Sequence, residues 1–575
     1  MTTGLVILSD WIASNESLFS FNSVELPDVV ENPDRGRRAL DRLALPAPWQ
    51  PGRVVGTVEE LFAARFRLPQ GAKPRPVQKA ACEVVEGMAG PGLVIIEAPM
   101  GEGKTEAALA AVEIMSRRWG AGGVHVALPT QATTDAMFDR VVAWLDSMGA
   151  DNQSVGAITL SHGKARFNRL FRGIIGTGPL AEIGCDEGCG SGHHTPEHAV
   201  VAHSWLSGRK KSQLANFVVG TIDQLLFAGL KSRHLMLRHL ALAGKIVVLD
   251  EVHAYDVFMN SYLTKVLTWL GAYRVPVLAL SATLPPDRRR ELLQAYQRGL
   301  STAANAGVPI ICDDVTDDTG YPVLSWTEGM QVIRRDVPPS GRRTTVSIDA
   351  LGGAADDDLD VLTGLLLDLL WDGGCALVVR NTVRRALQTA VALEAEFPGE
   401  VTVAHSRFMS ADRLRKDAGL LNRFGPPGPD VDRPARHIVV ASQVVEQSLD
   451  VDFDVLVTDL APVDLILQRL GRLHRHDRGA GQADRPPKLR SAHAYVAGVD
   501  FTQDPPELET AAAKHVYGSY PLLRSAAALL PRLGGTVELP DDIAPLVRAA
   551  YGSEYIEPAS WQDVVEDAHT KWLHQ

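Results

Sequence analysis

The chain has 575 residues and a formal net charge of −12, with 45% hydrophobic and 22% charged residues. These proportions are ordinary for a globular protein, and the length predicts about three or four domains. The acidic balance excludes a uniformly basic surface, so any contact with nucleic acid must come from local basic patches. Five cysteines are too few for a disulfide framework in a chain of this length, which favours a reducing cytoplasm.

The first 72 residues are predicted to lead into the main fold. Residues 1–20 are typical of one amphipathic helix, and residues 21–72 of a proline-bearing linker that ends in a short helix near residues 58–66. The N-terminal stretch has no basic leader, so it is a poor signal peptide. No apolar run reaches the ~20 residues of a membrane span. We therefore expect no membrane partner.

A glutamine precedes the first predicted strand, in residues 73–78, KPRPVQ. The amide of Gln78 can donate and accept hydrogen bonds at once, which suits the N6/N7 edge of adenine. Taken alone, the segment is more often a simple turn before a helix.

Residues 92–107, GLVIIEAPMGEGKTEA, predict a strand, a glycine-rich loop and a helix. Leu93–Glu97 is nearly all apolar, as in a strand buried on both faces of a parallel sheet, and the helix continues through Trp119. The loop nearly matches the phosphate-binding pattern, with Ala98 in place of the first glycine. An ordinary loop between strand and helix is the weaker alternative. The chain is therefore predicted to bind a nucleoside triphosphate.

The expected nucleotide-binding residues share this loop and have different roles. Glycines let backbone N–H groups face phosphate oxygens, and the helix N-terminus adds partial positive charge. Lys104 is expected to reach the β- and γ-phosphates, and Thr105 to ligate magnesium. The loop residues assigned to the nucleotide are Gly101, Glu102, Gly103, Lys104 and Thr105.

A second apolar strand, residues 246–250, delivers two adjacent carboxylates to the edge where ligands bind in α/β sheets. Asp250 can hold magnesium through its water shell, and Glu251 can orient and deprotonate an attacking water. An acidic pair that caps the next helix is the weaker alternative. Ser281-Ala282-Thr283 follows another strand, residues 277–281, and can either hydrogen-bond the acidic motif or cap a helix.

A second α/β series contains residues 468–475, QRLGRLHR. Arg472 and Arg475 are three residues apart, so we expect them side by side on one helix face. Paired guanidiniums that face a triphosphate stabilise charge in the transition state. A solvated basic helix is the alternative.

The alternation of strands and helices predicts the α/β class, with two parallel-sheet domains and helical flanking segments. The expected strands lie at residues 93–97, 124–129, 217–221, 246–250 and 277–281, then at 376–380, 402–405, 437–441 and 455–459. The expected divisions are residues 1–20, a linker at 21–72, a first domain at 73–300, a second at 301–495 and a helical segment at 496–575.

As an ordered set, these motifs resemble a superfamily 2 helicase over roughly residues 73–480. That resemblance implies two RecA-like lobes with ATP and Mg²⁺ between them and single-stranded nucleic acid across both. The segments GRKK at residues 208–211, VGTIDQ at 219–224, DEVHAYD at 250–256, HSRF at 405–408 and QVVEQSLD at 443–450 resemble one subfamily more closely. It is the CRISPR-associated helicase–nuclease of type I interference, which the Cascade surveillance complex recruits to degrade invader DNA.

The resemblance implies further roles. Gln78 would read adenine, and Arg472 and Arg475 would close the site from the second lobe, with Gln468 of the same motif among the catalytic residues. Asp450 would couple nucleotide state to the grip on DNA. The family moves 3′ to 5′ on single-stranded DNA.

The chain departs from this family at both ends. The family begins with a two-metal HD nuclease domain, of which residues 9–14 resemble only the last helix. Asp10 would then be an orphan metal ligand, and one carboxylate cannot hold a catalytic metal pair. The C-terminal domain also looks truncated. His476-Asp477 is expected to be unrelated to metal binding. We therefore expect ATPase activity here and nuclease activity only from a separate HD protein.

Other candidates stay open. Cys185, Cys189, His193 and His198 have metal-binding atoms, but their spacing is cramped for zinc, so a loop insertion is favoured. Basic segments at residues 209–211 and 231–238 either track DNA phosphates or are solvated faces. The rival functions are a helicase outside CRISPR biology, acting on RNA or DNA, and an inactive remnant that only docks on Cascade.

Overall fold

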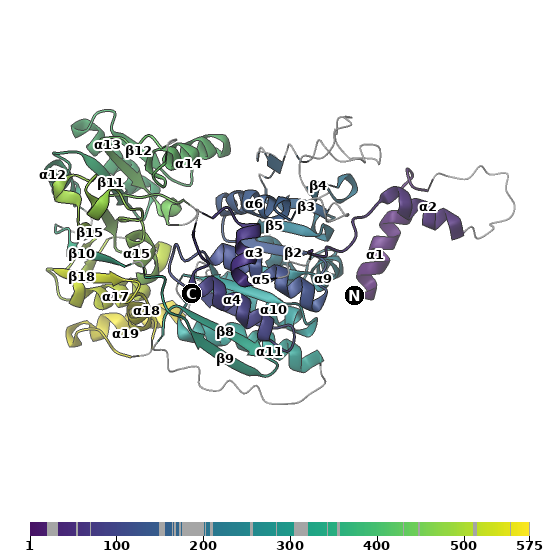
Figure 1. Ribbon diagram of the computed structural model, residues 1–575. Helices are drawn as coiled ribbons and strands as arrows, with labels where there is room; N and C mark the ends of the chain where they lie inside the picture. The colour runs from purple at the N-terminus through teal and green to yellow at the C-terminus, as the bar shows by residue number, and fades with distance from the viewer. Residues whose placement is uncertain are drawn as a thin grey trace. The chain divides into compact units, whose positions relative to one another are not determined.

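The structure is a computed structural model. It describes the chain except for residues 20–32, 53–55, 69–70, 149–155, 164, 166–167, 169, 172–173, 175–199, 202, 208–210, 253–256, 283, 304–319, 342, 354–356, 429–430, 447–448, 510–514, 553 and 574–575. The chain divides into two compact units, Met1–Ser340 and Gly341–Gln575, each with one large sheet (Figure 1). Among the described residues, no helix has the length and apolarity that crossing a membrane requires.

The first unit is built on a nine-stranded sheet in the order β4-β3-β5-β2-β6-β7-β1-β8-β9. The strands from β4 to β1 in that order are parallel, whereas β8 runs antiparallel to β1 and β9 antiparallel to β8. Their bounds are β1 Leu93–Glu97, β2 Val124–Leu128, β3 Gly156–Ser161, β4 Val200–Val201, β5 Phe217–Thr221, β6 Ile246–Leu249, β7 Val277–Ser281, β8 Val323–Glu328 and β9 Gln331–Asp336.

Helices cover both faces of this sheet, which explains why the central strands β1, β2, β5, β6 and β7 are buried at every position and mostly apolar. Val94 and Ile96 of β1 face one helical layer, and Leu93 and Ile95 face the other. The first layer contains α3 Val58–Arg65, α4 Pro76–Gly87, α5 Lys104–Trp119 and α6 Gln131–Asp146. The second contains α8 Ile222–Leu226, α9 Leu235–Ala243, α10 Val257–Ala272 and α11 Pro286–Ala303.

The N-terminal helix α1, Thr2–Ala13, is shorter than the predicted one and packs on α9. Gly4 lies so close that a Cβ there would be 2.6 Å from the carbonyl oxygen of Met236. The rings of Trp11 and His234 meet edge to face at 5.2 Å. A helix that the sequence did not predict, α2 Pro33–Leu43, lies in the expected linker.

The second unit is built on a seven-stranded sheet in the order β12-β13-β11-β14-β15-β10-β18, parallel except for β18. The bounds are β10 Thr344–Ala350, β11 Gly374–Val379, β12 Val401–Ala404, β13 Arg436–Ala441, β14 Val455–Asp459, β15 Ala492–Ala497 and β18 Gly535–Leu539. A separate pair contains β16 Val499–Asp500 and β17 Glu507–Leu508. The helices include α12 Leu359–Leu369, α13 Val383–Glu396, α14 Ser410–Phe424, α15 Val463–Leu470, α17 Ser519–Leu529, α18 Ile543–Tyr551 and α19 Gln562–Leu573. Two largely parallel sheets with flanking helices confirm the predicted α/β class.

The C-terminal residues pack into the second unit. The hydroxyl of Tyr551 donates to Asp464 Oδ1 at 2.5 Å, and buried Arg524 forms an ion pair with Glu557 at 2.9 Å. Strand β18 adds to the sheet beside β10. The segment expected to be helical, residues 496–575, also contains strands: β16 and β17 precede α17, and β18 follows it.

Candidate functional site

The loop at residues 98–103, called the phosphate-type loop below, joins β1 to α5 at the carboxyl edge of the first sheet. Gly101 and Gly103 have φ values of +87° and +74°, in the left-handed region that favours glycine. Lys104 starts α5, and its Nζ donates to the carbonyl oxygens of Ala98 and Pro99 at 2.7 and 3.2 Å. The Lys104 side chain therefore lies over the loop that is predicted to bind a phosphate group.

Gln78 is buried on α4 against this loop. Its Oε1 accepts from the backbone N–H of Arg75 at 2.8 Å, and its Nε2 donates to the Gly103 carbonyl at 3.2 Å. A Cβ at position 103 would lie 2.1 Å from that Nε2. The glutamine thus braces the phosphate-type loop in addition to any contact with a base.

The acidic pair follows β6, and only β7 separates β6 from β1 in the sheet. The N–H of Glu251 donates to Asp250 Oδ1 at 3.0 Å, and Glu251 has a φ of +51°, which is strained for a residue with a side chain. Burial and the Glu251 carboxylate raise the pKa of Asp250 to about 7, against the opposing charges of Lys104 and Arg140. The carboxylate pair and Lys104 therefore belong to one electrostatic site.

The donor atoms at this site suit magnesium. A threonine hydroxyl and a carboxylate are oxygen ligands, and Mg²⁺ is typically held by few protein groups together with substrate phosphates and water. Thr105 Oγ1 accepts a hydrogen bond from Arg140 of α6 at 3.4 Å, so a cationic group already lies beside it. Among the described residues, no group of three or more His, Cys, Asp or Glu could hold a metal alone. Thr105 and Asp250 fit a metal shared with a nucleotide.

The end of β7 lies between the phosphate-type loop, which follows β1, and the acidic pair, which follows β6. The carbonyl of Ser281 accepts from the N–H of Ala98 at 3.1 Å. This bond joins the serine motif, which is Ser281-Ala282-Thr283 in the sequence, to the phosphate-type loop. The hydroxyl of Tyr321 donates to the Ala282 carbonyl. Thr283 lies outside the described residues. The sequence does not predict that Tyr321 belongs to the site, because this tyrosine is part of no recognisable motif.

In the second unit, the expectation that Arg472 and Arg475 share a helix face is wrong. Helix α15 ends at Leu470, and Gly471 follows. The chain is then drawn to the start of β14, because Phe453 donates to the Arg472 carbonyl and accepts from the N–H of His474, at 3.0 and 3.1 Å. Pairing with the neighbouring segment therefore replaces another helical turn.

The arginines of this motif have different environments. Arg469 is fully buried and forms an ion pair with Glu446 at 2.5 Å. Arg472 is also buried, and it donates to the backbone carbonyls of Val445 and Glu446 at 3.0 and 2.7 Å. Gln468 is buried in α15. Arg475 is the most exposed of these three arginines, with a side chain 14% exposed.

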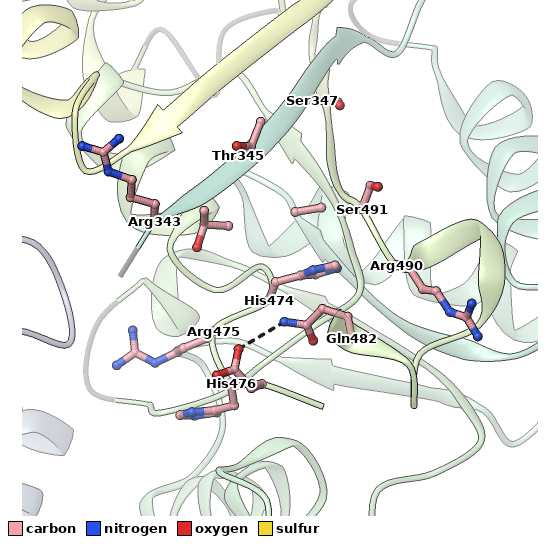
Figure 2. A pocket seen from close by; sticks show the side chains of 12 residues that line it. Arg343, Thr345, Ser347, His474, Arg475, His476, Gln482, Arg490 and Ser491 are labelled. Atoms are coloured by element: carbon pink, nitrogen blue, oxygen red, sulfur yellow. Dashed lines mark hydrogen bonds between the residues drawn. The ribbon is translucent and has the colours of Figure 1, made fainter. Parts of the chain in front are cut away.

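Arg475 lines a cavity of about 540 Å³ (Figure 2). Its Nε forms an ion pair with Asp450, whose Oδ1 also contacts His476 Nε2 at 3.1 Å. Burial opposes ionisation, but the His476 hydrogen bond and the Arg475 charge hold the pKa of Asp450 well below its usual value. Asp450 therefore fixes the direction of Arg475.

Other predicted site residues either take no part in the site at β1 and β6 or lie outside the described residues. Asp10 is exposed on α1, and no described metal-binding cluster contains it. Cys185, Cys189, His193 and His198 lie outside the described residues, as do Arg209, Lys210, His253, Gln447 and Ser448. These assignments stay predictions.

Comparison with known proteins identifies related chains. Residues 372–478 match the family described as CRISPR-associated nuclease/helicase Cas3, C-terminal. A CRISPR-associated nuclease/helicase Cas3 from Streptococcus thermophilus is 37% identical over 96% of this chain, and the match covers 55% of that relative. The chain thus spans little more than half of that protein.

Solved structures agree with the sequence match. The crystal structure of T. fusca Cas3-AMPPNP superposes with a TM-score of 0.79 at 30% identity, covering 99% of this chain and 62% of that one. A chain in a structure titled CRISPR RNA-guided surveillance complex, pre-nicking, has a TM-score of 0.70 at 28% identity, covering 99% of this chain and 60% of that one. Over the part of those proteins that it spans, the chain is similar to the CRISPR-associated nuclease/helicases named Cas3.

Proposed function

We propose that this chain is the ATP-driven motor of a CRISPR-associated helicase. It hydrolyses ATP with Mg²⁺ and moves 3′ to 5′ along single-stranded DNA, unwinding invader DNA for degradation. The observation that carries this proposal is that the loop after β1, which leads to Lys104 and Thr105 at the start of α5, and the acidic pair after β6 lie at one edge of the first sheet, where Lys104 acts on the charge of Asp250.

The residues of the first unit divide the work of hydrolysis. Lys104 and the N–H groups of the glycine loop bind the phosphates, and Thr105 with Asp250 would hold Mg²⁺. When bound, Mg²⁺ neutralises charge on the β- and γ-phosphates. Glu251 orients water for attack and accepts its proton. Gln78 contacts adenine and keeps Gly103 in place.

The residues of the second unit respond to the nucleotide. Arg475 supplies the positive charge that the transition state requires, and Asp450 aims it. Arg472 acts with it by holding the carbonyls of residues 445 and 446, which precede Asp450. A cavity-facing arginine held by a carboxylate supports this division of roles.

The partners follow from the related proteins. One similar structure is titled a CRISPR RNA-guided surveillance complex, which supports Cascade as the complex that delivers DNA to this chain. The nuclease step is not assigned to the described residues, because one carboxylate cannot hold a catalytic metal pair. Asp10 alone cannot supply it.

The first experiment measures ATP hydrolysis with and without single-stranded DNA. We expect stimulation by DNA to exceed stimulation by RNA, and Lys104→Ala to abolish turnover. Lys79→Ala, at an exposed lysine of α4, is the matched control and should behave as the unaltered protein. Equal or stronger stimulation by RNA would favour the RNA helicase alternative, and no turnover with DNA would favour the docking remnant. Unwinding of duplexes with a 3′ or a 5′ overhang tests the direction.

A further inference from the structure

The hairpin of β8 and β9 lies beside the strand that delivers the phosphate-type loop. β8 pairs antiparallel with β1, with Glu97 opposite Val323. Glu97 is buried and forms an ion pair with Arg289 at 2.5 Å, so helix α11 also fixes the end of β1. The hairpin is also the last element of the first unit, which ends at Ser340. It therefore connects the predicted ATP site to the start of the second unit.

Tyr321, two residues before the start of β8, touches the serine motif. The hydroxyl of Tyr321 donates to the Ala282 carbonyl, next to Ser281. Burial and the carboxylates of Glu97, Glu102 and Glu251 raise the pKa of Tyr321 above its usual range. The hydroxyl therefore keeps its proton and stays a donor at neutral pH. It also lies among the acidic groups of the site.

Ser340, four residues after the end of β9, holds the phosphate-type loop. Ser340 donates from its hydroxyl to Glu102 Oε1 at 2.6 Å, and from its N–H to the same oxygen at 3.4 Å. Glu102 is 4% exposed, and its Oε2 is buried with no hydrogen-bond partner among the described residues. The next residue, Gly341, has a φ of +90° and opens the second unit. The anchor of this carboxylate is thus the last residue before that turn.

We propose that Ser340 and Tyr321 are positioning residues that tie the nucleotide loop and the serine motif to the two ends of hairpin β8–β9. The conformation of the loop and that of the segment that ends the first unit are then set together. This inference rests on the proposed ATP site. It reassigns Glu102 from direct nucleotide contact to the anchoring of the loop.

The physical reason is the charge that a triphosphate brings to the loop. Glu102 lies between the two glycines that are predicted to curl around phosphate, and a buried carboxylate there is costly unless it is hydrogen-bonded and turned aside. Ser340 supplies those hydrogen bonds. Any rearrangement of Gly101–Gly103 on binding nucleotide moves the Glu102 side chain, and Ser340 moves with it.

The test measures AMPPNP affinity with Mg²⁺ and amide hydrogen exchange over residues 337–341. In the unaltered protein, AMPPNP should change exchange in this segment. Ser340→Ala should weaken AMPPNP binding by about tenfold, the loss expected for one charge-assisted hydrogen bond, and should remove the exchange response. Ser340→Thr keeps the hydroxyl and should restore both.

Matched controls separate positioning from general damage to the fold. Ser301→Ala removes a hydroxyl that donates to a backbone carbonyl on α11, and Tyr296→Phe removes a buried hydroxyl that donates to Val275. Neither should alter AMPPNP affinity or exchange at residues 337–341. Tyr321→Phe should increase exchange near residues 280–282, whereas Tyr296→Phe should not.

A double-variant comparison identifies the partner of Ser340. In a protein that already carries Glu102→Ala, Ser340→Ala should have no further effect on AMPPNP affinity. Additive losses, or a Ser340→Ala protein that matches Ser301→Ala in affinity and exchange, would overturn the inference while leaving the ATP site standing. Failure of the unaltered protein to bind AMPPNP would overturn both the inference and the proposed function.

Discussion

Lys245 shows how strongly burial acts on a single residue in this fold. It is 6% exposed immediately before β6, and its Nζ donates to the Gln213 carbonyl at 2.5 Å. Burial lowers its pKa to about 7. The unfolded chain, with an ordinary lysine pKa near 10.4, therefore binds more protons than the folded chain between about pH 7 and pH 10.

Lys245 therefore makes the stability of the fold depend on pH. Because the unfolded state holds more protons in that window, the free energy of unfolding rises with pH, by up to about 1.4 kcal/mol per pH unit from this group. Lys245→Met should remove that part of the slope, measured by urea unfolding at pH 7, 8 and 9. Lys79→Met, at an exposed lysine, should keep the slope. Identical slopes for Lys245→Met and the unaltered protein would contradict the assignment.

At the scale of elements, a buried ion network fixes the loops around α15. Asp452 is fully buried and accepts hydrogen bonds from Arg478 and Arg485, at 2.5 and 2.9 Å. Burial opposes ionisation, but the charges of Arg485 and Arg433 hold the pKa of Asp452 below its usual value. The network ties the segment that contains Arg475 to the start of β14.

Removing one carboxylate from this network leaves arginines buried without their partner. Asp452→Asn should lower the free energy of unfolding by about 3–5 kcal/mol, as for other buried ion pairs that lose one member. Urea unfolding measures the effect. Asp477→Asn changes an exposed acid in the same loop, and its effect should stay within about 0.5 kcal/mol. A loss from Asp452→Asn as small as that of the control would show that the network is not stabilising.

Elements with a strong apolar pattern were predictable from the sequence, and those set by tertiary contacts were not. Strands β1, β5, β7 and β14 lie where the sequence predicts them, because strands buried on both faces of a parallel sheet are nearly continuous apolar runs. Hairpin β8–β9 was missed because β9 reads QVIRRD and is mostly polar. It is a strand because it pairs with β8.

The same distinction applies to the candidate site. Lys104, Thr105, Asp250 and Glu251 could be chosen in advance because loop chemistry and strand ends determine their places. Tyr321 and Ser340 reach the site only through the antiparallel hairpin, so local sequence gives no signal for them. The end of α15 at Leu470 likewise depends on pairing with Phe453.

At the scale of the whole molecule, the chain contains two units that each have a sheet and a core of their own. The phosphate-type loop and both acidic residues belong to the first unit. A ligand stabilises the unit that binds it, by about 2.7 kcal/mol when its concentration is 100 times its Kd.

Calorimetry can assign the nucleotide to a unit. We expect two unfolding transitions, of which AMPPNP with Mg²⁺ raises the one that belongs to Met1–Ser340. Lys104→Ala should abolish that rise and leave the other transition in place. An equal rise in both transitions would mean that the second unit contributes to ground-state binding.

The contact between Gln78 and Gly103 has a consequence for natural variation. No side chain fits at position 103 while the amide of Gln78 lies 2.1 Å from where its Cβ would be. A relative that replaces this glycine must therefore turn the amide at position 78 away from the loop or change that residue, so we expect the two positions, 25 residues apart in sequence, to vary together.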